Sequence, residues 1–401
     1  MSRALNVVLV LIDSLNRGDL PAYGGRTVET PNIDRLARRS FRFDDHFVGS
    51  LPCMPARREL FAGFKELLWR PWGPLEHYDG RLPRLLARAG YATTIVTDHY
   101  HYWEEAANGY LQSFRETELV RGHEWDNWKG PVPEDEPLPA WVERIERWRP
   151  GGGRRYFANV RDFEGEEDFF PAKTFRAAAA RLERARAPFF LQVESFDVHE
   201  PFHVPEPYRS LHGDPSGYDR FTVWPPYQDP SALAAFMAGT TPEELAFVRS
   251  QYLGKLAMVD RWLGELLDVL DRRGLWEETA VVLTTDHGHD LGERGVFGKQ
   301  YPHRDSHANI PLLVWHPEHP GGGRSIVGLT STVDLHATIA ELAGVEVEPP
   351  HGRSLLPLLR GEAWPREAHL YGTFGEGVCC TDGEWTIFKS PTRDAPLYAY
   401  S

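Results

Sequence analysis

The sequence predicts an α/β fold with a mostly parallel central sheet, helices on both of its faces, and a small C-terminal antiparallel subdomain. Continuous apolar runs rich in β-branched residues recur along the chain, which is typical of strands that are buried on both faces. Helical patterns lie between these runs, and such alternation indicates an α/β architecture. The expected strands are 6–12, 92–96, 189–193, 280–283 and 312–315, and the expected helices are 83–89, 175–185 and 244–270.

Polar residues follow directly after two of the expected strands. Asp13 comes after the first strand, and Asp286-His287 comes after the strand that begins at position 280. In open parallel sheets, the carboxyl ends of the strands form the edge where ligands bind. We therefore expect the functional site at this edge, with the Pro- and Gly-rich loops 131–139 and 201–230 forming walls of its pocket.

A further helix is expected at 331–343, after the last strand of the sheet. Ser331 is placed to cap its start, with Asp334 three residues later, and Gly344 is placed to end it. We expect this helix to be structural.

The C-terminal segment has a different pattern. Residues 368–374 and 385–390 predict antiparallel strands joined by a turn at 381–383. We accordingly divide the chain into a main domain, 1–360, and a partial C-terminal subdomain, 361–401. Because the sequence ends on a strand-like pattern without a cap, we expect it to lack part of this subdomain.

The composition is that of an ordinary globular protein, with 41% hydrophobic and 25% charged residues, which argues against a disordered or fibrous chain. The 44 Lys and Arg residues against 58 Asp and Glu residues give a net charge of −14, so we expect no nucleic-acid partner. No apolar stretch approaches the roughly 20 residues of a membrane helix, so we expect no membrane association. Three cysteines give no disulfide framework, which favours a cytoplasmic location.

The polar residues at the strand ends are candidate metal ligands. The carboxylate of Asp13 can bind a hard cation through oxygen, and Asp286-His287 offers a carboxylate beside an imidazole. Taken alone, each has a simpler explanation. An aspartate after a strand is often a cap or turn residue, and an Asp-His pair on a loop is common without any function.

The segment Cys53-Met54-Pro55-Ala56-Arg57, with Gly63 six residues after the arginine, makes the prediction more specific. A lone cysteine is usually a small buried hydrophobe. The spacing Cys-x-Pro-x-Arg, however, resembles the signature of the sulfatase family, within the alkaline phosphatase superfamily and its phosphonate monoester hydrolase relatives. Further segments along nearly the whole chain share the resemblance: Gly24, 30–37, 87–91, 333–335 and 343–344.

The resemblance implies an alkaline-phosphatase/sulfatase-like α/β sandwich in which 1–360 is the catalytic domain. It also implies that a formylglycine-generating enzyme oxidises Cys53 to formylglycine. One divalent metal ion, Ca, Mn or Mg, would then be bound by Asp13, Asp286, His287 and the hydrated aldehyde at position 53. One hydroxyl of that diol attacks sulfur or phosphorus, and loss of the proton from the other expels the ester group by breaking the carbon–oxygen bond.

Cationic or titratable residues complete the expected site. Pro55 suits the first turn of a helix, which places residue 53 at a helix N-terminus that favours an anion, and Arg57 one turn later. His199 is the candidate general acid or sulfate ligand, and Lys299 is a point charge for the transferred group. For each of these, a purely structural role is the competing interpretation.

The sequence departs from the family pattern at two places. Many sulfatases have two consecutive aspartates after the first strand, where this chain has Asp13-Ser14. Many also have a lysine before a histidine after the strand at 92–96, where this chain has no lysine and offers His99 and His101 instead. Either histidine could bind an oxygen or take the proton, and the sequence does not distinguish between them.

Three functional hypotheses follow. The first is metal-dependent hydrolysis of a sulfate ester, the second is hydrolysis of a phosphonate monoester or phosphodiester at the same site, and the third is a non-catalytic binding protein with Cys53 as a thiol. The acidic net charge favours a small substrate over a polyanionic polymer. Aromatic residues in 68–72 and 101–103 could line the pocket for a sugar or an aryl ring, or could belong to the core. A homo-oligomer is possible on this sequence.

Overall fold

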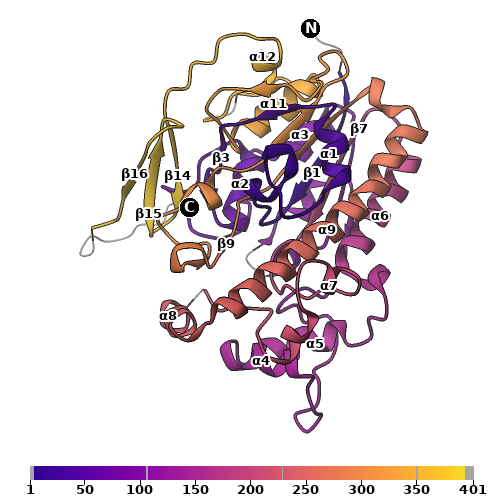
Figure 1. The fold of residues 1–401 in the computed structure, drawn as a ribbon. Coiled ribbons are helices and arrows are strands. Elements are labelled where there is room, and N and C mark those ends of the chain that lie inside the picture. Colours follow the sequence, from indigo (N-terminus) through magenta and orange to yellow (C-terminus); the bar gives the residue numbers. More distant parts are fainter. Residues whose placement is uncertain (1–3, 105–106, 228, 349–350, 393–401) are drawn as a thin grey trace.

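An eight-stranded sheet forms the centre of the computed structural model, which describes residues 4–104, 107–227, 229–348 and 351–392 (Figure 1). The strand order is β12-β2-β11-β8-β1-β7-β5-β6. In chain order these strands are β1 (Asn6–Ile12), β2 (Phe41–Phe43), β5 (Ala92–Thr97), β6 (Glu116–Leu119), β7 (Phe189–Ser195), β8 (Thr279–Thr284), β11 (Leu312–Trp315) and β12 (Ser325–Ile326). All five strands expected from the sequence are therefore present.

The sheet is mostly parallel, as predicted. Strand β1 pairs in parallel with β7 and with β8, and β5 pairs in parallel with β7 and with β6. Strand β11 is the exception, because it runs antiparallel to both of its neighbours, β8 and β2. A continuous apolar run predicts that a strand is buried on both faces, but it does not predict the direction of the strand.

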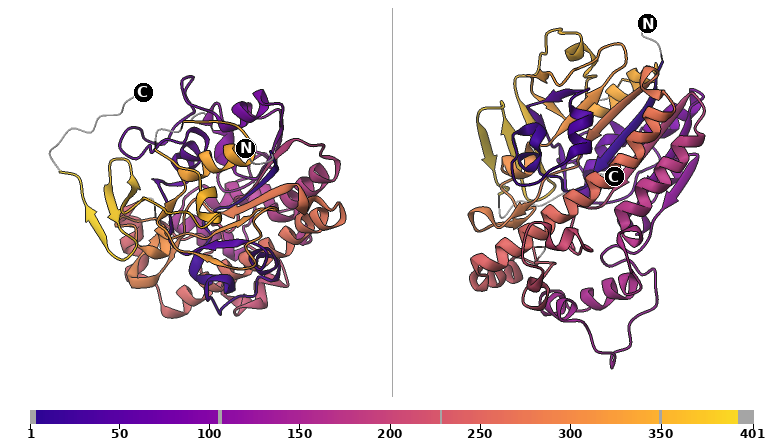
Figure 2. Two further views of the ribbon diagram at one scale, coloured as in Figure 1. Left: turned by 90° about the horizontal axis from the view of Figure 1, so that it is seen from above. Right: turned by 45° about the vertical axis from the view of Figure 1, so that its right-hand side comes forward.

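Helices cover both faces of the sheet (Figures 1 and 2). One face carries α1 (Pro31–Ala37), α6 (Phe170–Arg184) and α9 (Pro242–Arg272); the other carries α2 (Cys53–Ala62), α3 (Leu82–Arg88), α11 (Asp334–Leu342) and α12 (Leu356–Leu359). Successive side chains of β1 lie alternately in the hydrophobic cores on the two faces of the sheet. Val8 and Val10 pack on the α6 and α9 side, and Val7 and Leu9 pack on the α2 side. This explains why β1 is apolar at every position.

Smaller helices and strands surround the sheet. The helices are α4 (Ala140–Trp148), α5 (Gly152–Val160), α7 (Tyr208–Leu211), α8 (Pro230–Gly239) and α10 (Asp305–Ala308). Short 3-10 helices lie at Arg17–Asp19, Pro21–Tyr23, Tyr100–Trp103, Leu111–Ser113, Glu166–Asp168, Pro215–Asp219, Leu275–Glu277 and Glu293–Gly295. The paired short strands are β3 (His46–Phe47) with β13 (Thr330–Ser331), and β9 (Asp290–Leu291) with β10 (Phe297–Gly298). No helix in the described ranges has the length and apolar character needed to cross a bilayer.

The two predicted loops occupy the end of the molecule where β1 finishes. Residues 131–139 lie between β6 and α4 without regular structure, as expected. In 201–227, α7 and the short 3-10 helix Pro215–Asp219 are the regular elements. Helices α4, α5, α7 and α8 gather at this end (Figure 1). They were not predicted; α5 begins with two glycines, which are poor helix formers.

The C-terminal sheet corrects the prediction of two strands joined by one turn. Strands β14 (His369–Thr373) and β16 (Thr386–Lys389) are separated by an unpredicted strand, β15 (Gly377–Thr381), and the turn at 381–383 joins β15 to β16. Strand β14 also pairs in parallel with β4 (Ser50–Leu51), directly before Cys53. The C-terminal sheet is thereby attached to the segment that carries the candidate nucleophile. The boundary at 360 remains a prediction.

The predicted helix 331–343 is shorter than expected, and its proposed cap is wrong. Helix α11 begins at Asp334, because Ser331 belongs to β13 and pairs with β3. The Asp334 carboxylate accepts a hydrogen bond from the Ser331 backbone N–H at 2.9 Å, while the Ser331 hydroxyl caps nothing. Gly344, with φ of +66°, lies just after the helix as predicted.

Asp334 also binds Arg353 and Arg366, in the segment that leads to the C-terminal sheet. It is fully buried and accepts hydrogen bonds from Arg366 Nη1 at 2.5 Å and Nη2 at 2.6 Å, and from the Arg353 backbone N–H at 2.9 Å. A two-pronged pair of this kind is strong in itself and costly to break on one side.

We expect Asp334→Asn to lower the free energy of unfolding by about 2 to 4 kcal/mol, because it leaves the half-buried Arg366 charge without its partner. Denaturant unfolding measures this change. The matched control is Glu362→Gln, which breaks the exposed pair of Glu362 with Arg360 and should change stability by less than about 0.5 kcal/mol. Equal effects of the two variants would contradict the assignment.

Candidate active site

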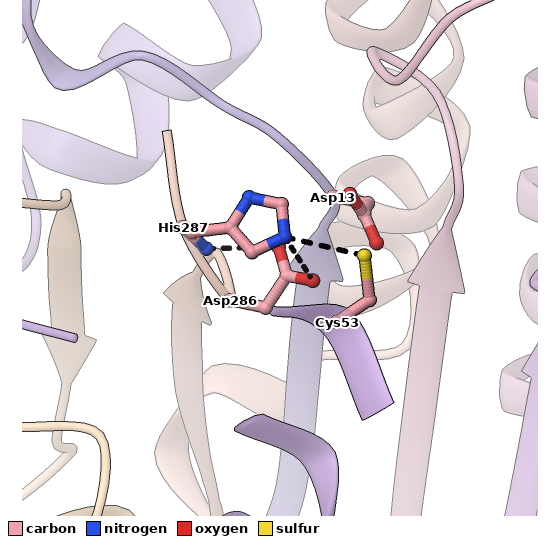
Figure 3. Close-up of side chains that lie close together, drawn as sticks. All are labelled: Asp13, Cys53, Asp286 and His287. Atoms are coloured by element: carbon pink, nitrogen blue, oxygen red, sulfur yellow. Dashed lines mark hydrogen bonds and ion pairs between the residues drawn. The ribbon is translucent and has the colours of Figure 1, made fainter. Parts of the chain in front are cut away.

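The ends of two central strands and the start of one helix bring four candidate ligands together. Asp13 follows β1, and Asp286 and His287 follow β8; since Leu11 lies opposite Thr284 in the parallel register, the two carboxylates reach the same level. Cys53 is the first residue of α2. Ligand atoms of all four side chains lie within 4.8 Å of one another, and all four are buried (Figure 3).

Arg57 forms hydrogen bonds with three residues of this group, Asp13, Cys53 and Asp286. It lies one turn after Cys53 and is fully buried, and its guanidinium donates to Asp13 Oδ2 at 3.0 Å and to Asp286 Oδ2 at 2.6 Å. It also donates to the Cys53 carbonyl at 3.0 Å and lies 3.5 Å from Glu194 Oε2. The predicted arginine thus contacts both candidate metal-ligand carboxylates, and it links α2 to both strand ends.

The buried carboxylates of Asp13 and Asp286 would be stabilised by an additional cation. Burial raises the pKa of Asp13 well above its ordinary value, and the neighbouring Asp286 charge raises it further. Burial also opposes the charge of Asp286, but His287 and Arg57 hold the pKa of that carboxyl below its ordinary value. Two carboxylates in close contact do not both ionise easily without positive charge between them. A divalent ion at this position would supply it.

The orientation of His287 is also suited to binding a divalent ion. Its Nδ1–H donates to the Gly288 carbonyl at 3.0 Å, which leaves the Nε2 lone pair facing the other three ligands. Nε2 lies 3.2 Å from Cys53 Sγ (Figure 3). Two carboxylate oxygens, an imidazole nitrogen and an oxygen in place of the sulfur would suit a divalent metal.

Lys299 and His199 form a pair beside Cys53. Lys299 follows β10, and its Nζ lies 3.5 Å from Cys53 Sγ and 2.6 Å from His199 Nε2. The Nδ1 of His199 faces the Glu200 carbonyl at 2.9 Å and Glu124 Oε1 at 3.1 Å, so Nδ1 carries the proton and Nε2 accepts from Lys299. Burial lowers the pKa of His199 well below its ordinary value, which keeps the ring neutral.

The two histidines after β5 lie in different parts of the site. His99 is buried, stacks on Phe196 at 4.6 Å between ring centroids, and has its Nε2 3.8 Å from Asp13 Oδ2. His101 lines the cavity outside the metal-ligand group, and its Nδ1 lies 2.8 Å from Glu104 Oε2. His99 is therefore adjacent to the metal ligands, and His101 faces the space available to a substrate.

A cavity of about 580 Å³ opens above Cys53. Its lining comes from loops of the first half of the chain, from the loop before α8, and from the C-terminal sheet. The lining residues are Leu51, Pro52, Cys53, Trp72, Tyr100, His101, Glu104, Glu124, Trp125, His199, Tyr227, Pro230, Lys299, Gln300, His307, Thr373 and Glu376. Of the two loops predicted to wall the pocket, 201–230 contributes Tyr227 and Pro230, whereas no residue of 131–139 is among these lining residues.

Sequence reasoning missed three residues of the site. Glu194, at the end of β7, is fully buried against Arg57, and a charged residue inside an otherwise apolar strand was the signal that could have identified it. Glu124 lies on a loop and His307 lies in the short helix α10, and neither gave such a signal. His307 is buried and lines the cavity, and its Nε2 has no hydrogen-bond partner among the described residues.

A mostly parallel α/β sheet thus presents two carboxylates, an imidazole and a helix-terminal cysteine at one edge, an arrangement suited to a hydrolase. The sequence profile of the sulfatase family matches residues 5–345, and the chain belongs to that family.

Two curated relatives and one solved structure illustrate the similarity. The chain is 25% identical to a choline-sulfatase of Rhizobium meliloti over 95% of this chain and 77% of the relative. It is 24% identical to the iduronate 2-sulfatase of Homo sapiens over 99% of this chain and 83% of the relative. A phosphonate monoester hydrolase of Agrobacterium radiobacter has the same fold, with a TM-score of 0.71, 22% identity, and coverage of 96% of this chain and 89% of that one. These relatives indicate a hydrolase rather than the non-catalytic binding protein considered from the sequence.

We expect Asp13→Asn to weaken the binding of Mn²⁺ by about 100-fold or more, because it removes an anionic ligand. Calorimetric titration of the protein with Mn²⁺ measures the affinity. In the unchanged protein, this affinity should fall as the pH falls through the raised pKa of Asp13, since protons then compete with the metal.

Asp98→Asn is the matched control for this titration. Asp98 is another buried carboxyl after a strand, its pKa is raised to about 7 by burial, and it accepts from the Phe196 backbone N–H at 2.6 Å, outside the four-residue group. We expect its variant to bind Mn²⁺ as the unchanged protein does. Unaltered binding in Asp13→Asn would remove that residue from the ligand set.

Proposed function

We propose that this protein hydrolyses small sulfate esters with one divalent metal ion and with formylglycine produced from Cys53 by a formylglycine-generating enzyme. The observation that carries the proposal is the position of Cys53. It starts α2, and its sulfur lies 3.2 Å from His287 Nε2 and 3.5 Å from Lys299 Nζ. A nucleophile placed there would have the metal ligands on one side and a cation for the transferred group on the other.

The residues around position 53 would each act on charge. The free N–H groups at the start of α2 favour an anion there. Arg57 holds Asp13 and Asp286 in place through bonds of 3.0 and 2.6 Å. Formylglycine would supply a geminal diol as nucleophile, and the metal would supply positive charge for the diol and the transferred oxygens.

The pair of Lys299 and His199 is our candidate source of the proton for the leaving oxygen. Lys299 Nζ–H points at His199 Nε2, so the pair holds one shared proton in addition to the His199 Nδ1–H. When the ester bond to the leaving oxygen breaks, that proton can pass through Nε2 to the alkoxide. Glu124, at 3.1 Å from Nδ1, would stabilise the ring while it carries positive charge.

Phosphonate monoester or phosphodiester hydrolysis is the second candidate. It is favoured by the similarity of the fold to phosphonate monoester hydrolases, which extends over 96% of this chain in one case and 97% in another. The sulfate group and the phosphonate or phosphodiester group are close in size and charge, so Lys299 and a metal could bind either of them. We prefer the sulfate ester because the family profile and the curated relatives name sulfatases. A cytoplasmic site of action remains part of this proposal, in keeping with three cysteines that are all free.

The test compares para-nitrophenyl sulfate with para-nitrophenyl phenylphosphonate, using protein made together with a formylglycine-generating enzyme. We expect kcat/KM to be higher for the sulfate, and activity with either ester to be lost after chelation and restored by added metal. A preference of about a hundredfold or more for the phosphonate, equivalent to about 2.7 kcal/mol in transition-state binding, would establish the second candidate instead.

We expect His199→Asn to slow the hydrolysis of alkyl sulfates by about a hundredfold or more while slowing that of para-nitrophenyl sulfate far less, because a good leaving group needs no proton. Steady-state kinetics on the two esters measures this. The control is His77→Asn, an exposed histidine, which should leave both rates unchanged. Equal losses on both esters in His199→Asn would assign His199 to binding the transferred group.

A further inference from the structure

The cavity above Cys53 has a floor and walls of different chemistry. Cys53, His199, Lys299 and His307 lie at the floor, where the transferred group would be bound. The rest of the lining must therefore receive the alcohol part of the ester. This inference rests on the proposed function, and it concerns which alcohol these walls select.

Three carboxylates line the walls. Glu104 and Glu124 come from loops after β5 and β6, and Glu376 comes from the turn between β14 and β15. Lys299 is the only lysine or arginine among the described lining residues, and it lies at the floor beside Cys53. The walls therefore carry negative charge without a basic residue of their own.

Glu104 and Glu376 are exposed to solvent, and Glu124 is buried with its Oε1 at 3.1 Å from His199 Nδ1. Burial raises the pKa of Glu124, and the nearby Glu200 charge raises it further; partial burial also raises the pKa of Glu376. Glu376 has a side-chain hydrogen bond with Thr373, and Glu104 has the imidazole of His101 at 2.8 Å. A cation in the cavity would be attracted to all three, whereas an anionic alcohol such as a uronate would be repelled.

Aromatic rings occupy the same walls. Trp72, Tyr100 and Trp125 line the cavity, and Trp125 is 39% exposed although it packs on Trp224 behind it. Tyr227 also lines it, but cations already lie near its ring, with Arg149 at 5.3 Å and Lys299 at 5.6 Å from the centroid. Trp72 and Tyr100 lie beside the His101 ring, at 4.8 and 4.2 Å between centroids. Aromatic faces combined with carboxylates are a favourable environment for an ammonium group.

We propose that this cavity is a subsite for a positively charged leaving group, so that the substrate is the sulfate ester of an alcohol bearing an ammonium group. Neutral sugars and aryl rings would use the aromatic walls alone and would gain nothing from the negative charge of the carboxylates. The ammonium ester uses both.

A matched pair of esters tests the proposal. One is trimethylammonioethyl sulfate, and the other is its neutral isostere, in which carbon replaces the quaternary nitrogen. In the formylglycine-containing protein, we expect kcat/KM to be about tenfold or more higher for the cationic ester, from charge and cation–π attraction in a partly desolvated cavity. Equal or lower values for the cationic ester would overturn the proposal.

Two variants connect this preference to the walls. Glu376→Gln and Trp125→Leu should each reduce the ratio of kcat/KM for the cationic ester to that for the neutral ester by about threefold or more. Glu277→Gln is the control, because Glu277 is exposed and precedes β8, at the opposite edge of the sheet from Cys53. If both wall variants retained the preference of the unchanged protein, the cavity would not be its source.

A binding measurement separates this inference from the proposed reaction. The two free alcohols can be titrated into protein that retains Cys53 as a thiol, where no turnover is needed. We expect the cationic alcohol to bind about tenfold more tightly than the neutral one, and equal affinities would overturn the subsite. Absence of turnover on every sulfate ester, together with selective binding of the cationic alcohol, would reject the proposed reaction and retain the subsite.

Discussion

The buried guanidinium of Arg57 is the contact on which the rest of the site depends. It joins the start of α2 to the ends of β1 and β8 through Asp13 and Asp286, with no exposed surface on any of the three side chains beyond 1%. Three carboxylates surround this one arginine when Glu194 is included. Removing a partner from such a buried group costs about 3 to 5 kcal/mol, so the position of Cys53 and the charge of the metal site are coupled to the stability of the fold.

The excess of negative charge continues from the metal ligands into the cavity. Arg57 offsets only part of the charge at the strand ends, and the proposed divalent ion would offset more of it. Lys299 provides the positive charge on the other side of Cys53, where an anionic group would be transferred. Above it, the walls are acidic and aromatic. The order of charges, a cation at the floor and anions at the walls, matches an ester with a negative end and a positive end.

The sequence predicted the central strands, the helices α3, α6 and α9, and the four candidate ligands that the structure brings together at one edge. These features leave local signals: apolar runs, helical periodicity and a spaced motif. It could not supply contacts between distant segments. Strand β15 carries two adjacent cysteines and a glycine, and its pairing with β14 and β16 gives it its structure. Ser331 looked like a helix cap because its partner in β3 is remote in sequence. The contact of Glu124 with His199 joins two different loops, and the parallel pairing of β14 with β4 joins segments that are far apart in the sequence. Neither contact can be predicted from the local sequence.

The central claim concerns one side chain, and the mass of the tryptic peptide 43–57, which contains Cys53, tests it most directly. The protein would be prepared with and without a formylglycine-generating enzyme. The account predicts that with the enzyme the CH2SH group is replaced by CHO in this peptide, and that hydrolysis of sulfate esters increases with the converted fraction. A thiol that is unchanged in both preparations, accompanied by metal-dependent hydrolysis at the same rate, would contradict it, because the reaction would then proceed without the proposed nucleophile.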